Sequence, residues 1–312
     1  MIKISEIKLP LDSDDKELRT AAAKALRCKE ERITSLRIAK KAVDSRKKDN
    51  VFFVYNVYAE VDSDEAAIIA HSRNSKVEAY TEYKYVMPPV RRKSTLRPVI
   101  AGFGPAGFFA ALTLARAGLR PIVLERGADV DTRTQKVNVF WTQRKLDTES
   151  NVQFGEGGAG TFSDGKLTTG IKDPLCRKVV DELIAHGAPE EIGYSSRPHI
   201  GTDRLGAVVK AFREEIIALG GEVRFNCRLT DIIIANGVVQ GVTCVHDGSA
   251  EDIETDTLLL CIGHSARDTV KMLYDKGADI IQKPFSVGVR IEHPRELIDK
   301  AQSVSYTHLT LP

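Results

Sequence analysis

The feature that most constrains the fold is a glycine-rich turn at residues 99–107, which read VIAGFGPAG. An apolar strand leads into the turn, and a helix rich in small residues is expected to follow it as far as Gly118. A second apolar strand at 121–124 then ends in Glu125. A strand, a tight turn, a helix and a second strand make a βαβ unit, which predicts an α/β fold of the Rossmann type.

Each small residue of this turn has a distinct physical role in such a unit. Gly102 permits the tight turn, Gly104 lets the backbone approach a pyrophosphate, and Gly107 lets the helix pack closely on the sheet. Pro105 and Ala106 begin the helix, whose first N–H groups and positive dipole end favour phosphate. The turn is therefore predicted to bind a dinucleotide, although a glycine-rich turn also occurs in other α/β proteins.

The acidic residue after the second strand favours the same interpretation. Glu125 lies 23 residues after Gly102 and is placed to accept hydrogen bonds from an adenosine ribose. Arg126 follows it directly and favours FAD over NAD without deciding between them.

A family resemblance enters with three later segments. Residues 155–167 read GEGGAGTFSDGKL, residues 261–269 read CIGHSARDT, and residues 284–294 read PFSVGVRIEHP. These segments resemble a family of uncharacterised bacterial FAD-dependent oxidoreductases, some of them described as NAD-utilising dehydrogenases. Residues 40–48, KKAVDSRKK, resemble the leader domain of that family, so the likeness covers residues 1 to about 302.

The resemblance implies FAD as cofactor and a flavoprotein fold of the glutathione-reductase type, in which a β-rich or substrate segment interrupts the FAD-binding domain. Carried over by position, Gly157, Gly158, Gly160 and Ser163 would lie along the pyrophosphate and ribityl side of the flavin. Gly263 would supply a second contact. A run of small residues suits close backbone approach to a ligand, but it is also typical of a flexible surface loop.

The implied function is that of an FAD-dependent oxidoreductase, with NAD(P)H as a candidate reductant. Two alternatives stay open: a flavin monooxygenase, and a binding protein in which FAD is structural and the leader domain docks a partner. The catalytic residues are not identified by the sequence. His199, His264 and Lys166 lie in loops and are candidates for a proton donor, although for each alone a structural hydrogen bond is the favoured role.

The domain organisation follows from the order of the expected elements. Residues 1–87 are predicted to form a ferredoxin-like α+β leader domain, residues 88–96 a linker, and residues 97–303 the FAD-binding domain with the start of a substrate domain. The expected elements of the leader are strands at 2–9, 32–38, 51–58 and 77–86, with helices starting at Asp14 and near 64–72. Farther along, a β-meander is expected at 222–228, 231–235 and 238–246, followed by an apolar strand at 257–263.

Composition excludes several other classes of protein. No apolar run is long enough to span a bilayer, and no secretory signal is visible, which together predict a cytoplasmic protein with free thiols. Residues 1–97 hold 21 lysines and arginines against 15 acidic residues, but the strand at 51–58 lacks the pattern of an RNA-binding strand, so nucleic-acid binding is not expected. The substrate is expected to be a small molecule, and the sequence does not determine its identity or the oligomeric state.

The cysteines predict neither a redox-active disulfide nor a metal site. None of the five forms a C-x-x-C pair, and Cys227, Cys244 and Cys261 fall on expected strands, where buried thiols are usually inert. Cys244 and His246 are two residues apart, which does not make a metal site without further ligands.

The last nine residues stand apart from the rest of the sequence. Residues 304–312 read VSYTHLTLP and resemble the translation of a sequencing-library adapter. The native sequence is therefore expected to stop near Ser303, before the later Gly-Asp motif with which related flavoproteins complete the flavin site.

Overall fold

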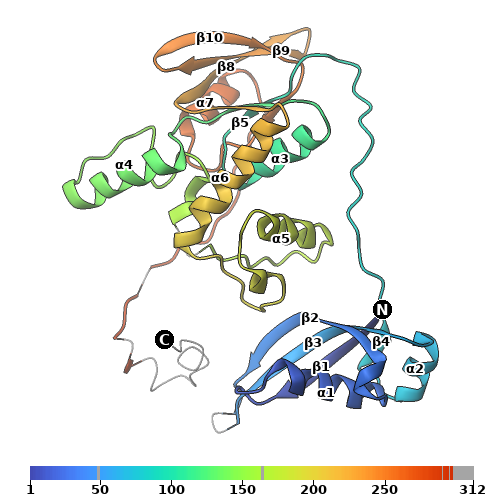
Figure 1. Cartoon of the computed structure of the whole chain (residues 1–312). Coiled ribbons are helices and arrows are strands. Elements are labelled where there is room, and N and C mark those ends of the chain that lie inside the picture. Colours follow the sequence, from blue (N-terminus) through green and yellow to red (C-terminus); the bar gives the residue numbers. More distant parts are fainter. Residues whose placement is uncertain (48–49, 163–164, 290, 295, 298–312) are drawn as a thin grey trace.

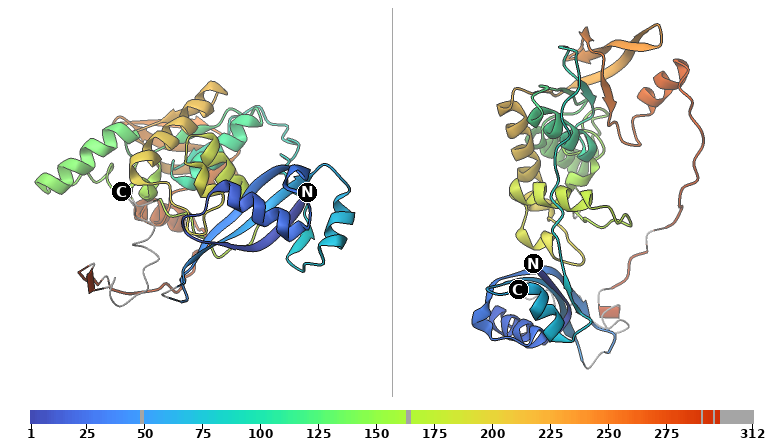
Figure 2. Two further views of the ribbon diagram at one scale, coloured as in Figure 1. Left: turned by 60° about the horizontal axis from the view of Figure 1, so that its bottom comes forward. Right: turned by 90° about the vertical axis from the view of Figure 1, so that its right-hand side faces the viewer.

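The computed structural model describes residues 1–47, 50–162, 165–289, 291–294 and 296–297. The prediction for residues 304–312 and the one for Ser163 therefore lie outside the described residues. The described chain forms a small leader unit and a larger α/β unit, joined by a long extended segment (Figures 1 and 2). In the described part, no helix combines the length and the apolar character that crossing a membrane requires.

The leader unit is a four-stranded antiparallel sheet with two helices on one face. Its strand order is β2-β3-β1-β4, which confirms the predicted ferredoxin-like fold. Its elements are β1 (Ile2–Leu9), α1 (Asp15–Leu26), η1 (Glu30–Arg32), β2 (Ile33–Asp44), β3 (Phe52–Val61), α2 (Glu65–Ser72) and β4 (Val77–Ala79).

Local chemistry explains where these elements begin and end. The Asp14 side chain accepts a hydrogen bond from the Glu17 backbone N–H at 2.8 Å, and Glu17 returns one to Asp14, which makes the capping box that starts α1. The strand predicted at 77–86 is wrong beyond Ala79, where the ladder with β1 ends at Ile2, and one further bond joins the Tyr80 N–H to the Met1 carbonyl oxygen at 3.0 Å. Residues 80–98 contain no helix or strand, so the extended segment is longer than the predicted linker.

The larger unit is built on a parallel sheet with the order β11-β5-β6-β7. Helix α3 (Pro105–Arg116) connects β5 to β6, as the βαβ prediction requires. Helix α6 (Thr202–Ala218) leads into β7 at the edge of the sheet. The four strands are β5 (Val99–Ala101), β6 (Ile122–Leu124), β7 (Glu222–Arg224) and β11 (Leu258–Leu260).

Side chains alternate between the two faces of the parallel sheet, so each face has its own apolar core. Ile100 and Val123 point to the helix face and pack in one apolar cluster with residues of α3 and α6. Val99 and Ala101 point the other way and pack against an antiparallel sheet made of β8 (Cys227–Ala235), β9 (Val238–His246) and β10 (Ser249–Glu254). The result is a helix layer, a parallel sheet and a β-meander stacked in that order (Figure 1).

The meander differs from the prediction at its first strand. The expected strand 222–228 is interrupted at Asn226, whose φ is 49°. Its first half, β7, joins the parallel sheet beside β6, and only Cys227 onward enters the meander. The turns at 236–237 and 247–248 have positive φ at both residues, which suits tight hairpins.

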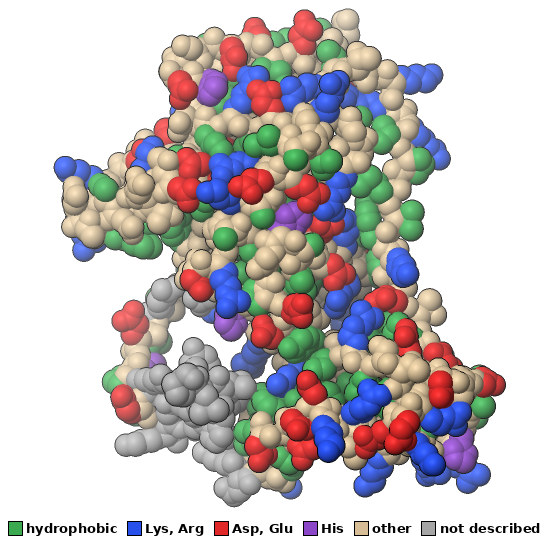
Figure 3. All heavy atoms as spheres, viewed as in Figure 1, with side chains coloured by type: hydrophobic (Ala, Val, Ile, Leu, Met, Phe, Trp, Pro, Cys, Tyr) green, Lys and Arg blue, Asp and Glu red, His purple; other side chains and the backbone are tan. Residues whose placement is uncertain are grey.

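Among the described residues, five further elements belong to the larger unit. They are α4 (Val130–Gln143), η2 (Gly158–Phe162), α5 (Leu175–Ala185), η3 (Glu190–Gly193) and α7 (Arg267–Asp275). The edge strand β2 of the leader meets the segment after η3: Lys41 N–H donates to Tyr194 O at 2.7 Å, and Ser196 N–H donates to Lys41 O at 2.9 Å. On the face shown in Figure 3, basic and acidic side chains are interspersed over the leader rather than gathered in one basic patch.

Candidate functional site

The turn after β5 requires glycine at two positions. Gly102 has φ +98°, and a Cβ built there would lie 2.4 Å from the Cys261 carbonyl oxygen. A Cβ on Gly107 would lie only 1.9 Å from the Gly102 carbonyl oxygen. The backbone of α3 therefore packs directly on the turn, and neither glycine can accept a side chain without movement of the main chain.

The first turn of α3 is exposed at Pro105 and Ala106, so a ligand could reach it. Gly104 is its N-cap residue, Pro105 occupies the first helical position, and no side chain caps the helix. A Cβ on Gly104 would meet only the Gly158 Cα, at 3.7 Å, so this glycine leaves space rather than relieving a clash. The first N–H groups of a helix have no partner within the helix, which makes this end a suitable place for an anion.

The second glycine-rich segment packs against the first. Gly157 N–H donates to Phe103 O at 2.9 Å, and Gly158, with φ +63°, lies against Gly104. Gly160 follows within η2, where nothing lies within 4 Å of a built Cβ. Backbone from two distant parts of the sequence thus forms the two sides of one cleft.

Glu125 connects both segments to the end of β6. Its side chain is buried, and its carboxylate accepts three backbone N–H groups: Phe103 at 2.7 Å, Gly127 at 2.9 Å and Gly155 at 2.9 Å. A carboxylate offers about four lone-pair sites, so one remains for a further donor such as a ribose hydroxyl. Glu125 therefore links the backbone at Phe103, Gly127 and Gly155, and its carboxylate also lines the cavity.

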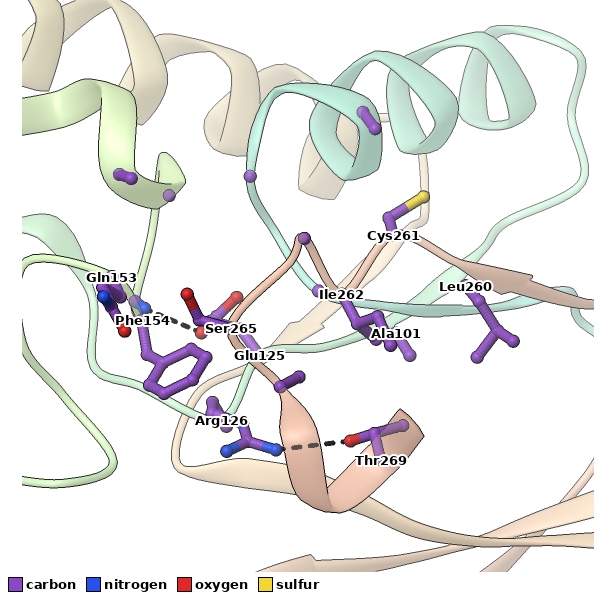
Figure 4. A pocket seen from close by; sticks show the side chains of 18 of the residues that line it. Ala101, Glu125, Arg126, Gln153, Phe154, Leu260, Cys261, Ile262, Ser265 and Thr269 are labelled. Atoms are coloured by element: carbon purple, nitrogen blue, oxygen red, sulfur yellow. Dashed lines mark hydrogen bonds between the residues drawn. The ribbon is translucent and has the colours of Figure 1, made fainter. Parts of the chain in front are cut away.

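Arg126 forms the neighbouring wall with α7. Its guanidinium donates to both carboxylate oxygens of Asp268, at 2.8 and 2.9 Å, and lies 4.5 Å from the centre of the Phe154 ring. Figure 4 shows its hydrogen bond to Thr269, which is 3.3 Å long. Burial raises the pKa of Asp268, but the bond from Arg126, the Thr269 backbone N–H and the charges of Arg126 and Arg228 together hold that pKa below its ordinary value. The flat guanidinium is thus fixed beside an aromatic ring, an arrangement that suits a planar base.

These groups enclose a cavity of about 520 Å³, within the usual range for a ligand pocket. The loop after β11 completes it with Gly263, which has φ +67°, and His264. The sequence-predicted residues that line it are Gly102, Gly104, Pro105, Ala106, Glu125, Arg126, Gly158, Gly160, Gly263 and His264. Gly107 and Gly157 lie behind this lining and support it.

The three candidate proton donors do not meet at one place. Lys166 and His199 are opposite each other in a short antiparallel bridge, held by the bonds Leu167 N–H to Pro198 O and Ile200 N–H to Gly165 O. Both side chains are exposed, and neither lines the cavity. His264 alone of the three lies at its wall, with its Nε2 3.3 Å from the Ser265 Oγ.

The sequence reasoning missed a buried ion cluster behind the second glycine-rich segment. Arg133 is fully buried on α4, and its guanidinium donates to four carbonyl oxygens, those of Asn151 (2.8 Å), Val152 (2.9 Å), Gly155 (3.3 Å) and Glu156 (2.6 Å). Burial lowers the pKa of Arg133 to about 10, so it stays charged at neutral pH. One arginine thus holds the whole turn from 151 to 156.

Glu156 supplies the negative charge of this cluster. It is fully buried, accepts the Val130 N–H at 2.7 Å, and has its Oε1 3.3 Å from the Arg213 Nε. Burial raises the pKa of Glu156 above its ordinary value. A signal for the cluster was present in the sequence, because Val130, Arg133 and Val137 share the helical spacing of a buried face.

Part of the chain matches a protein family, and most of it is similar to a known protein. Residues 1–60 match the family described as "Domain of unknown function (DUF8436)". The chain is 48% identical over 303 residues to an uncharacterized protein of Clostridium beijerinckii, covering 96% of this chain and 56% of that protein. The chain therefore spans about half the length of this curated relative.

Solved structures resemble it only weakly. THI4 of Thermovibrio ammonificans is 16% identical with a TM-score of 0.37, covering 58% of this chain and 62% of that one. Glycerol-3-phosphate dehydrogenase of Bacillus halodurans, solved with FAD, is 14% identical with a TM-score of 0.37, covering 57% of this chain and 36% of that one.

Proposed function

We propose that this chain binds FAD at the two glycine-rich segments and that the protein is an FAD-dependent oxidoreductase. The observation that carries the proposal is the convergence of Gly104, Gly158 and Glu125 around one cavity at the uncapped start of α3. Small residues on both sides leave room for a pyrophosphate, and the acidic residue at the end of the adjacent strand has one acceptor site left. The residues present therefore fit the ADP half of the cofactor.

The proposal gives each part of the cavity a role. The N–H groups that start α3 and the backbone at Gly158 would hold the phosphates, Glu125 would accept a ribose hydroxyl, and Arg126 would border the base. When bound, FAD supplies hydride or electron transfer, and the protein contributes position and electrostatics. His264 is the candidate proton donor, because it lies at the cavity wall on the loop after β11.

Substitution of Gly104 by leucine tests the proposal. The backbone at Gly104 lies outside the left-handed region, so leucine fits the fold and directs its side chain into the gap between the two glycine-rich segments. We expect at least about tenfold weaker FAD binding, which corresponds to about 1.4 kcal/mol, with a similar unfolding midpoint. Fluorescence quenching of FAD on titration with protein measures the affinity.

The matched control is Gly170→Ala. Gly170 does not line the cavity, and nothing lies within 4 Å of a Cβ built there, so FAD affinity should equal that of the wild type. Equal affinity of the folded Gly104→Leu variant and the wild type would remove the assignment of the cavity to FAD.

The electron donor is a separate part of the proposal. We infer that NAD(P)H reduces the bound flavin, on the strength of the family resemblance alone. Anaerobic mixing of FAD-loaded protein with NADH or NADPH should bleach the visible flavin absorption. A flavin that stays oxidised with both nucleotides would remove NAD(P)H as the donor and leave FAD binding untouched.

A further inference from the structure

A second group of chemically reactive side chains gathers on one face of the β-meander. Strand pairing places Cys227 of β8 opposite His246 of β9, and Glu251 of β10 opposite Cys244 of β9. Cys244 and His246 are two residues apart on one strand, so they share a face, and their cross-strand partners lie on that same face. The sequence alone shows only the pair on β9, and the register of three strands adds two more potential ligands.

The distances bring three of these groups into the range of a metal site, and the fourth, Cys244, lies beside Glu251. One ligand atom each from Cys227, His246 and Glu251 lies within 4.8 Å of the other two. The Cys244 Sγ lies 3.5 Å from the Glu251 Oε1. Both cysteines are free thiols and fully buried, whereas the His246 and Glu251 side chains are 38% and 41% exposed. The group therefore has a closed apolar side and an open polar side through which an ion could enter.

We propose that Cys227, Cys244, His246 and Glu251 bind one zinc ion. Two thiolates, an imidazole and a carboxylate are the donor types that Zn²⁺ takes in tetrahedral sites, and the thiolates select against Mg²⁺ and Ca²⁺. Binding breaks two S–H bonds and forms two Zn–S bonds, and the two protons pass to solvent. The inference is independent of the proposed flavin function.

The surroundings of the four ligands suit this role. Arg224 donates to the Glu251 Oε1 at 2.7 Å and so fixes the orientation of the carboxylate. The same oxygen faces the Cys244 Sγ at 3.5 Å and the His246 Nδ1 at 3.8 Å. A bound ion would link the three strands of the meander to one another. Cys227 also lines the cavity proposed for FAD, so the ion would lie next to that cavity.

The experiment is zinc analysis of the purified chain after incubation with ZnCl₂ and dialysis. We expect about one zinc ion per chain in the wild type and less than about one tenth of that in Cys227→Ser and His246→Ala. Cys28→Ser and His71→Ala are matched controls in the leader unit and should retain the ion. A wild type without zinc, or folded site variants with unchanged zinc, would overturn the proposal.

Cobalt substitution keeps the proposal testable if the site variants do not fold. Titration of the zinc-free wild type with Co²⁺ should give the thiolate-to-cobalt absorption and the intense visible bands of a tetrahedral site, saturating at about one equivalent. A spectrum of weak octahedral bands without the thiolate absorption would contradict the site, as would a disulfide between Cys227 and Cys244 in freshly prepared protein.

Discussion

Replacement of Gly107 by alanine is expected to destabilise the α/β unit by about 3 kcal/mol, a large effect for one added methyl group. The new Cβ would lie 1.9 Å from the Gly102 carbonyl oxygen, and no side-chain rotation can separate a Cβ from a backbone oxygen. The start of α3 must therefore move off the end of β5, which also displaces the N–H groups proposed to hold the phosphates. Urea unfolding followed by circular dichroism measures the loss.

The control for this prediction lies three residues away. Gly104→Ser adds a side chain at the N-cap position, where serine is favoured and a built Cβ meets only the Gly158 Cα at 3.7 Å. Its unfolding free energy should stay within about 0.5 kcal/mol of the wild type. If Gly107→Ala were as stable as Gly104→Ser, the close contact between helix and turn would not exist as described.

Replacement of Arg133 by methionine should cost about 3–5 kcal/mol of unfolding free energy. Methionine fills much of the same space, but four carbonyl oxygens of the turn 151–156 lose their donor and buried Glu156 loses a nearby positive charge. Each buried polar group without a partner costs about 1–3 kcal/mol before the turn relaxes. Because Phe154 and Gly155 line the cavity, weaker FAD binding should accompany the loss of stability.

Arg144→Met on the same helix is the matched control for Arg133→Met. Arg144 is exposed at the C-cap of α4, so its substitution should change the unfolding free energy by no more than about 0.5 kcal/mol. Equal unfolding midpoints for the two variants in urea would show that the buried guanidinium does not organise the turn.

Local patterns predicted the parts of the molecule that depend on local chemistry. The turn at 99–107 was recognisable because the backbone needs glycine at fixed places, and the structure shows a positive φ at Gly102 and close packing at Gly107. The start of α1 at Asp14 followed from a capping box, and the leader topology followed from the order of its elements.

Features that depend on contacts between residues far apart in the chain could not be predicted from the sequence. The division of 222–228 between two sheets depends on β6 lying beside β7, and the short β4 is defined by its pairing with β1. The spacing of Val130, Arg133 and Val137 indicates a buried helix face, but it does not show what the guanidinium binds, because its four acceptors lie about 20 residues later in the chain. The proposed zinc ligands come from three strands, and only their register brings them together.

The most direct test of the central claim is competition at the FAD cavity. If the described residues hold the ADP half of the cofactor, ADP should displace FAD competitively, whereas FMN, which lacks that half, should bind at least about tenfold more weakly than FAD. Fluorescence titration of the wild type with FAD, repeated with ADP and with FMN, measures all three affinities. FMN binding as tight as that of FAD, or FAD that ADP does not displace, would contradict the account.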